Sequence, residues 1–238
     1  MPHVPGPTRF PHPLKALLIA LLLVLLASVN LNAQEALIEY LEGEVWIHHQ
    51  DERVSAELGS QLAPGDLVST GPRGLAVISL GDGARIKLRS STQVEIEAVR
   101  SAGSGSTSVG LRNGGIFARV ARAAGAGGPF QVRTPTVVAG VRGTEFFVAY
   151  GRTVEERPDV WLCVNEGAVE VAVRDSGART VVNEGEGINV LNGTRTTDPR
   201  FYQWTTELNW NLDPDQGEVR DTTDLDAAYR DLLDQDYD

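Results

Sequence analysis

Glu145 and Glu166 are the first carboxylates to consider for catalysis, because each lies beside a glycine turn between apolar strands. A glycosidase needs two carboxyl groups held several ångströms apart across a cleft, with separated pKa values. Both residues have a simpler interpretation. Glu145 is placed to pair with Arg142 at a strand end, and Glu166 occupies a turn position before Gly167. We therefore predict that these carboxylates do no chemistry and that the protein is not an enzyme.

Cys163 is the only cysteine, so the chain forms no internal disulfide. It lies in the apolar segment 160–164, where a small buried side chain is expected. A nucleophilic thiol needs a histidine beside it, and after residue 33 the chain offers only His48 and His49. Consecutive strand residues point to opposite faces, so these imidazoles do not reach one metal ion without a bulge. The sequence predicts neither a catalytic residue nor a metal site.

Three further segments partly match cofactor motifs. Residues 101–108 and 121–128 are glycine-rich, but neither loop ends in the Lys-Ser/Thr pair of a phosphate-binding loop. Residues 211–218 resemble a calcium loop, although the glycine falls one place late and no glutamate occupies the twelfth position. No cofactor is therefore expected.

Residues 1–33 are predicted to be a secretory signal peptide. Two positive charges precede an apolar run at residues 16–29, and Ala33 supplies a small residue for cleavage before Gln34. An uncleaved run would instead anchor the protein in a membrane, although it is short for a span. We expect a periplasmic or secreted bacterial protein, membrane-anchored if the segment is uncleaved.

The charge of the chain excludes two classes of partner. Of the 21 basic residues only Arg9 and Lys15 precede residue 34, so 19 basic and 32 acidic residues follow, a net charge of −13. Nucleic acids and anionic membrane surfaces select basic proteins, because phosphate contacts supply much of the affinity. We therefore expect no nucleic-acid partner, and no membrane contact beyond an uncleaved N-terminal anchor.

Short strand patterns with glycine-rich turns run through residues 34–192 and predict one all-β domain. Apolar and charged residues alternate most clearly at 84–88 and 93–98. One turn, with glycine shortly before a strand, is used three times, at residues 42–45, 113–116 and 166–169. Reuse of a turn is typical of a multi-stranded β-roll or a short β-helix, and a sandwich can do the same.

Two of these strands carry charged rows that are placed to face each other. Arg85, Lys87 and Arg89 form a basic row, and Glu95 with Glu97 forms an acidic one. Exposed cross-strand ion pairs contribute only about 0.2–1 kcal/mol each, enough to help the register of neighbouring strands.

The most specific stretch is 130–148, a run of strand formers interrupted by Pro135, Gly140 and Gly143. It predicts a turn between two core strands. Pro135 would end one strand, and the two glycines would supply backbone geometry that other residues avoid. The residues predicted for the core are Val132, Val137, Val141, Phe146 and Val148.

Residues 193–238 are predicted to form an aromatic helix followed by an acidic tail. Asp198 and Pro199 resemble an N-cap followed by proline at the first helical position. Residues 211–238 contain 10 acidic and 2 basic residues, and Thr223 is placed to cap a second short helix. The helix face expected to pack against the β-domain consists of Phe201, Trp204 and Leu208.

Seven motifs occur in order between Gly43 and Gly187, and together they resemble the FecR domain family. They lie at residues 43–45, 64–71, 80–88, 111–117, 130–135, 141–146 and 164–169. The resemblance implies an all-β extracytoplasmic module that senses or binds through protein contacts, without catalytic residues. The family-motif residues expected to be structural are Gly65, Asp66, Thr70, Asp82, Gly83, Gly114, Thr134, Pro135, Arg142, Gly143, Thr144, Glu145, Phe146 and Gly167.

Typical FecR regulators combine a cytoplasmic anti-sigma segment, one membrane helix and this β-domain, followed by a small α/β module. Here about 15 residues precede the apolar run, too few for an anti-sigma domain. We therefore expect a stand-alone secreted form, a non-catalytic binding or scaffold module that contacts a protein or a cell-envelope polymer. The alternative is a membrane-anchored component of a transmembrane signalling system of the iron-uptake type.

Overall fold

The computed structural model describes residues 36–81, 83–100, 105–122, 129–153, 156–225 and 227. They belong to one compact unit, Gln34–Asp238, and the predicted signal peptide lies outside them. No helix in this described part is long and apolar enough to cross a bilayer. The elements are β1 (Ala36–Glu42), β2 (Val45–His49), β3 (Glu52–Ser55), β4 (Gln61–Leu62), β5 (Leu67–Thr70), β6 (Leu75–Leu80), β7 (Ala84–Leu88), β8 (Gln93–Ala98), β9 (Thr107–Val120), β10 (Phe130–Arg133), β11 (Val137–Val141), β12 (Glu145–Thr153), β13 (Pro158–Glu166), β14 (Ala168–Val173), β15 (Arg179–Asn183), β16 (Glu186–Leu191), β17 (Arg195–Thr196), β18 (Arg200–Phe201) and the 3₁₀ helices η1 (Gln203–Glu207) and η2 (Pro214–Gln216).

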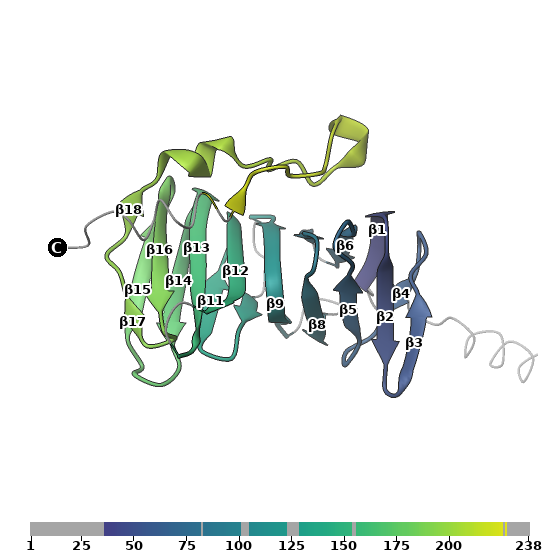
Figure 1. Cartoon of the computed structure of the whole chain (residues 1–238), viewed down its shortest axis with the longest axis horizontal. Coiled ribbons are helices and arrows are strands. Elements are labelled where there is room, and N and C mark those ends of the chain that lie inside the picture. Colours follow the sequence, from purple (N-terminus) through teal and green to yellow (C-terminus); the bar gives the residue numbers. More distant parts are fainter. Residues whose placement is uncertain are drawn as a thin grey trace, which may run out of the picture. The chain divides into compact units, whose positions relative to one another are not determined.

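The strands form two sheets whose inner faces share one hydrophobic core, which confirms the all-β prediction (Figure 1). All pairs are antiparallel except β9 with β10. The long strand β9 belongs to both sheets, pairing with β8 and β10 in its first half and with β7 and β12 in its second. Sheet A contains β1, β4, β6, β7, β9, β12, β13, β16, β17 and β18, and sheet B contains β2, β3, β5, β8, β9, β10, β11, β14 and β15.

The repeated glycine turn carries the chain from one sheet to the other. The chain changes sheet at Gly43 between β1 and β2, at Gly114 within β9, and at Gly167 between β13 and β14. All three glycines have positive φ, at +61°, +92° and +85°. A Cβ on Gly43 or Gly167 would also lie within 2.8 Å of a main-chain carbonyl oxygen. Other residues are therefore excluded by backbone geometry and by space, which explains why the sequence reuses this turn.

The segment 130–148 forms β10, β11 and the start of β12, as predicted. Its five predicted core residues are all buried. Pro135 lies in the turn after β10, and Gly143 has a positive φ of +68° in the turn between β11 and β12. Gly140 differs from the prediction, because it lies inside β11 and is not among the residues with positive φ.

Residues 202–225, here called the C-terminal strap, lie along the outer face of sheet A (Figure 1, yellow-green). That face is apolar over much of its length, so it needs cover. The strap side chains buried there are Tyr202, Leu208, Leu212 and Val219, and the sheet residues beneath them are Leu75, Val77, Phe117, Phe147, Trp161 and Cys163. Much of the predicted acidic tail is therefore part of the folded domain.

The aromatic α-helix predicted after Asp198 is wrong. The chain instead forms β18, which pairs with β16, and then the short 3₁₀ helix η1. Because pairing with β16 extends the backbone at this point, Phe201 is 68% exposed and Tyr202 turns toward the sheet. Leu208 is buried as expected. The second helix predicted after Thr223 falls largely outside the described residues.

The charged ladder predicted between β7 and β8 is also wrong, because these strands belong to different sheets. Arg85 pairs with Glu39, with Nε 2.8 Å from Oε2. Glu95 pairs with Arg112 of β9. Lys87 is buried on the outer face of sheet A, beneath the strap.

Candidate binding site

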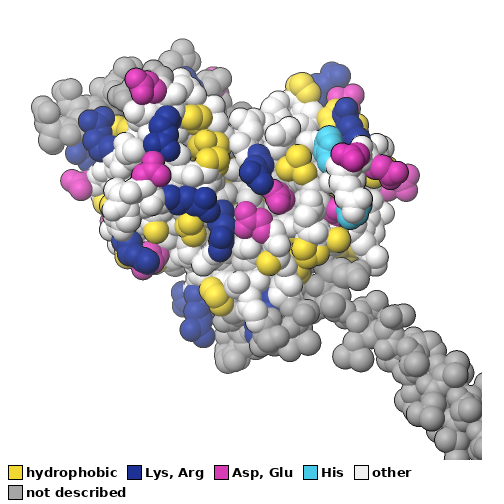
Figure 2. Space-filling view, turned by 90° about the horizontal axis from the view of Figure 1, so that it is seen from below, with side chains coloured by type: hydrophobic (Ala, Val, Ile, Leu, Met, Phe, Trp, Pro, Cys, Tyr) yellow, Lys and Arg dark blue, Asp and Glu magenta, His cyan; other side chains and the backbone are white. Residues whose placement is uncertain are grey.

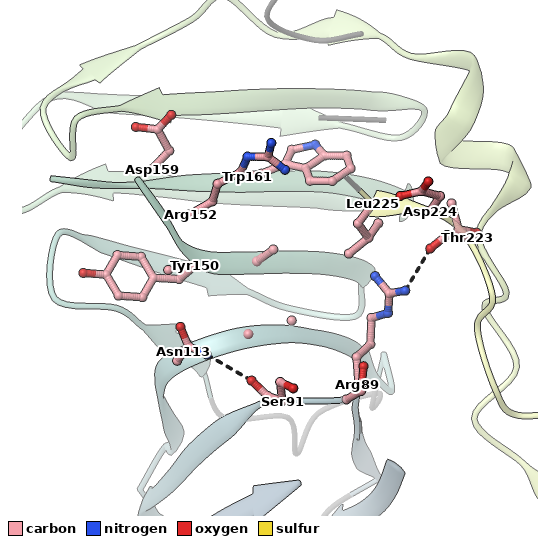
Figure 3. Close-up of a pocket in the computed structure, with 15 residues that line it drawn as sticks. Arg89, Ser91, Asn113, Tyr150, Arg152, Asp159, Trp161, Thr223, Asp224 and Leu225 are labelled. Carbon is pink, nitrogen blue, oxygen red and sulfur yellow. Dashed lines mark hydrogen bonds between the residues drawn. The ribbon is translucent and has the colours of Figure 1, made fainter. Parts of the chain in front are cut away.

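A pocket of about 450 Å³ opens where the end of the strap meets β9, β12 and β13 (Figure 3). Small-molecule sites commonly have volumes of about 300–1,000 Å³ and combine an apolar lining with a few polar groups. This pocket brings aromatic, charged and hydroxyl side chains together, so we take it as the candidate site. Its lining comes from residues 89–91, 113–115, 149–152 and 223–225, with Asp159 and Trp161.

Glycine backbone forms part of the lining, at Gly114, Gly115 and Gly151. A Cβ on Gly114 would lie 2.3 Å from the hydroxyl oxygen of Thr92, and one on Gly151 would lie 2.1 Å from Oδ1 of Asn113. Both positions also have positive φ, at +92° and +117°. Only glycine fits at these two positions, because the backbone has positive φ and because Thr92 and Asn113 occupy the space that a side chain would need.

Arg89 links the pocket to the strap. Its Nη2 donates to the carbonyl oxygen of Thr223 at 3.0 Å, and its Nε lies 3.5 Å from Oδ2 of Asp221. On the neighbouring corner, Asn113 donates from Nδ2 to the carbonyl oxygen of Ser91 at 3.0 Å (Figure 3). These bonds fix two polar side chains in orientation before any ligand arrives.

The other wall is formed by the end of β12 and the start of β13. Trp161 is almost fully buried and packs edge-on against Phe147, with ring centroids 5.7 Å apart. Arg152 lines the same pocket as Trp161 (Figure 3). Oδ1 of Asp159 accepts a hydrogen bond from the main-chain N–H of Asn192 at 2.6 Å, so this carboxylate is held in place. The wall is therefore rigid and carries charges of both signs.

Lys87 holds the strap over the sheet. Its Nζ donates to the carbonyl oxygens of Asn209, Asn211 and Val219 at 2.6, 2.9 and 3.0 Å. The same ammonium group lies 4.2 Å from the centre of the Phe117 ring. Burial lowers the pKa of Lys87 to about 8. Three acceptors and an aromatic face offset part of the cost of burying this charge.

Two more arginines attach the strap away from the pocket. Arg119 donates from Nη2 to the carbonyl oxygen of Trp210 at 3.1 Å. Arg220, on the strap itself, pairs with Glu42 and donates to the carbonyl oxygen of Arg73 at 3.2 Å. These main-chain hydrogen bonds and ion pairs hold the strap in addition to its buried apolar side chains, and the strap positions the pocket wall at 223–225.

Cys163 lies beneath the strap, and its thiol is fully buried. Burial raises the pKa of Cys163, so its thiol stays protonated. Among the residues that the structure describes, no group of three or more His, Cys, Asp or Glu side chains is placed to hold a metal ion. The pocket itself offers hydrogen-bond donors, acceptors and apolar surface.

The family-motif residues do not meet at one site. Gly114 lines the pocket, and Thr70 supports its rim by donating to the carbonyl oxygen of Arg89 at 2.5 Å and accepting from the N–H of Thr92 at 2.9 Å. Gly65 has a positive φ of +97° in the turn before β5. Asp66 is buried there, accepting from the N–H of Ala63 at 2.8 Å and pairing with His49.

The remaining motif residues lie at other turns. Gly83 has a positive φ of +80° in the turn between β6 and β7, and the neighbouring Asp82 lies outside the described residues. The hydroxyl oxygen of Thr134 accepts from the N–H of Val137 at 2.9 Å and closes the turn that contains Pro135. The Thr144 hydroxyl donates to the carbonyl oxygen of Ala168 at 3.0 Å, beside Gly143 and Gly167. Phe146 is in the core.

The ion pair predicted between Arg142 and Glu145 is wrong. Arg142 is exposed, and Glu145 instead lies 2.7 Å from Nη2 of Arg119 and accepts from Nδ2 of Asn165 at 2.6 Å. The reason is that β12 pairs with β9, which places Arg119 opposite Glu145 in the register. Glu166 is exposed next to the turn at Gly167, and neither glutamate lines the pocket.

The outer face of sheet B has a different character. Figure 2 shows the side away from the strap, where basic and acidic side chains lie interspersed. A second, more open hollow lies there beside Arg142 and Val181. Three ion pairs of this sheet are Glu95–Arg112, Glu97–Arg133 and Glu170–Arg179. Such exposed pairs contribute little energy.

The sequence did not point to the residues that make this site. Arg89 and Lys87 belonged to a row expected to face solvent, and Arg152 and Trp161 carried no motif. One signal was available, because Lys87 is the only lysine after residue 33 and sits in a strand that alternates apolar and basic residues. The segment that covers it lies more than 100 residues further along the chain.

The fold is an all-β domain in which a strap covers the outer face of sheet A and a pocket opens beside the end of the strap. Residues 66–170 match the family model described as FecR protein, so the chain carries a FecR domain over these residues. The match includes β5 to β13 and most of the pocket lining. No curated protein sequence matches the chain.

Two solved structures from Parabacteroides distasonis ATCC 8503 are similar, and both are described as a "putative anti-sigma factor". The first, solved at 1.65 Å resolution, has 22% identity and a TM-score of 0.48, covering 59% of this chain and 62% of its own. The second, solved at 2.50 Å, has 20% identity and a TM-score of 0.49, covering 70% and 72%. This chain therefore spans about 62% of the length of the first structure.

Proposed function

We propose that this chain is a non-catalytic, extracytoplasmic binding module of the FecR type, which acts through contacts with a protein or a cell-envelope polymer. The observation that carries the proposal is the pocket beside the strap, in which charged groups of both signs, hydroxyls and aromatic surface meet within a FecR domain. Rigid walls of this composition suit recognition of a polar partner. The N-terminal signal-peptide pattern supports a location outside the cytoplasm.

Chemical crosslinking in the native envelope, followed by mass identification of the attached molecules, tests this proposal. We expect one reproducible partner, either protein or glycan, that is not captured by a chain whose pocket is filled by Ala149→Phe. Copurification without any reproducible partner would contradict it.

A second candidate function follows from the same FecR match. The chain would then be a membrane-anchored component of a transmembrane signalling system, with residues 16–29 retained as its anchor. Intact-mass measurement of the protein from the envelope separates the two functions. A mature N-terminus at Gln34 supports the secreted module, and an intact N-terminus supports the anchored one.

An enzymatic function has one specific test. If a purified preparation hydrolyses a glycan and the Glu145→Gln variant loses that activity, the non-catalytic proposal is wrong. We expect Glu145→Gln to affect only stability, because Glu145 is bonded to Arg119 and Asn165 beside the strap.

A further inference from the structure

We propose that the pocket beside the strap binds an N-acetylated, uncharged saccharide, an inference that rests on the binding function proposed above. Its volume of about 450 Å³ is near the lower end for small-molecule sites, enough for about one or two sugar rings. The site also lies at the surface, so a sugar in the pocket can belong to a longer chain.

The charges around the pocket favour an uncharged ligand. The positive charge of Arg89 is already offset by Asp221, and Arg152 shares the pocket with Asp159 and Asp224. A polyanion gains little from such a balanced set of charges. Sugar hydroxyls both donate and accept hydrogen bonds, so they match guanidinium donors and carboxylate acceptors in the same pocket.

The pocket also has an apolar corner beside its polar groups. Ala149, Trp161 and Leu225 meet there, from β12, β13 and the strap. An acetamido group has a methyl that would be buried in such a corner and an amide that would stay among the polar groups. Burial of one methyl is enough to discriminate between acetylated and unmodified sugars by about threefold or more.

A peptide fits this site less well. Peptides commonly bind by adding a strand to an open sheet edge. Around the pocket, β9 is paired with β7 and β12, and β12 is paired with β13, which is itself paired with β16. Among the described residues these strands are paired on both sides up to Tyr150, so only the short end of β12 after Tyr150 is left for strand addition, and side chains with glycine backbone line the rest of the pocket.

The test uses the secreted chain and two probes with the same β-1,4 linkage, a trimer of N-acetylglucosamine and cellotriose, which has glucose units without acetamido groups. Calorimetry is expected to give a Kd below about 1 mM for the acetylated trimer. Cellotriose should bind at least about threefold more weakly, because it lacks the buried methyl. No binding of the acetylated trimer by folded protein, or equal affinity for both probes, would overturn the inference.

Two variants locate the binding. Ala149→Phe fills the apolar corner, and Arg152→Gln removes a charged donor, so each should weaken binding of the acetylated trimer at least about fivefold. Val181→Phe and Arg179→Gln on sheet B are the matched controls and should change nothing. Thermal unfolding verifies that each variant folds. If Ala149→Phe does not fold, Arg152→Gln decides the test. Undiminished binding by the folded pocket variants would overturn the inference.

Failure of this inference is distinguishable from failure of the proposed function. If the envelope experiment captures a protein at the pocket and the acetylated trimer does not bind, the saccharide is wrong and the binding module stands. If neither partner is found, both proposals are wrong.

Discussion

Lys87 and Phe117 lie directly opposite each other on β7 and β9, with the ammonium nitrogen of Lys87 4.2 Å from the centre of the Phe117 ring. The strap lies over this pair and supplies three carbonyl oxygens to the same nitrogen. A buried cation therefore connects the sheet to a segment that also forms one wall of the pocket. Since Lys87 is the only lysine after residue 33, amine-specific reagents report on this contact.

Replacing Lys87 should destabilise the domain. Lys87→Met keeps most of the side-chain volume but leaves three strap carbonyls without their donor, and we expect the free energy of unfolding to fall by about 2–4 kcal/mol. Urea unfolding measures the change. Arg85→Met is the control, because Arg85 is on the same strand in an exposed pair with Glu39 and should cost less than about 1 kcal/mol. Equal losses for both variants would mean that Lys87 does not hold the strap.

Lys87 should make the free energy of unfolding depend on pH. Burial lowers its pKa from 10.5 to about 8 in the folded protein, while the unfolded chain keeps the ordinary value. Between about pH 8 and pH 10.5 the unfolded state binds more protons, so stability should rise with pH over this range. Below about pH 8 the group is protonated in both states and adds no slope. The measurement is the difference in unfolding free energy between wild type and Lys87→Met. A difference that falls or stays flat from pH 8 to pH 10 would contradict the assignment.

Asp221 should control how often the strap end opens. Its Oδ1 accepts from the N–H of Asn209 at 3.2 Å and from the hydroxyl of Thr223 at 2.8 Å, and its Oδ2 lies near Arg89. Bonds to a charged group contribute about 1.5–3 kcal/mol. Asp221→Asn should therefore raise the rate of Lys87 acylation in the native protein by about tenfold or more, as followed by mass spectrometry.

Glu97→Gln serves as the control for this acylation experiment, because Glu97 forms an ion pair on sheet B, away from the strap. It should leave the acylation rate of Lys87 unchanged. If Asp221→Asn and Glu97→Gln label at the wild-type rate, the strap is not held by Asp221.

Two glycines that flank β14 allow the stability cost of a strained backbone to be measured separately from the cost of a steric clash. Gly167 and Gly177 both have positive φ, at +85° and +69°, but a Cβ on Gly167 would lie 2.8 Å from the carbonyl oxygen of Gly143, whereas Gly177 has nothing within 4 Å. Gly177→Ala should cost about 1 kcal/mol for the left-handed backbone alone. Gly167→Ala should cost clearly more, about 2–4 kcal/mol, because the sheet crossing must shift. Thermal or urea unfolding gives both values, and equal costs would show that the crossing tolerates a side chain.

Much of the fold follows from local sequence signals. Alternating apolar residues identify strands such as β7 and β8, and the glycine at each sheet crossing is specified by positive φ at Gly43, Gly114 and Gly167. These signals depend on neighbours in the sequence, so one chain is enough to detect them. The same local reasoning fails at Phe201, where pairing of β18 with β16 replaces the helix that Asp198 and Pro199 suggest.

The candidate site was not predictable in this way, because it is assembled from distant segments. The alternation on β7 places Lys87 on the outer face of its sheet, and only the fold reveals that residues 209–219 cover it. Arg89 and Trp161 meet at the pocket although 72 positions separate them in the sequence. Neither residue type nor spacing contains that information.

The most direct test of the binding function is site-specific photo-crosslinking in the native envelope, with the photoreactive residue at position 90, an exposed residue of the pocket lining whose side chain the proposed binding does not use. We predict one discrete adduct, which Ala149→Phe in the same chain abolishes and the sheet B variant Val181→Phe leaves intact. An adduct that persists at full yield when the pocket is filled, or no adduct from position 90 at all, would contradict the claim that this pocket is where the protein binds.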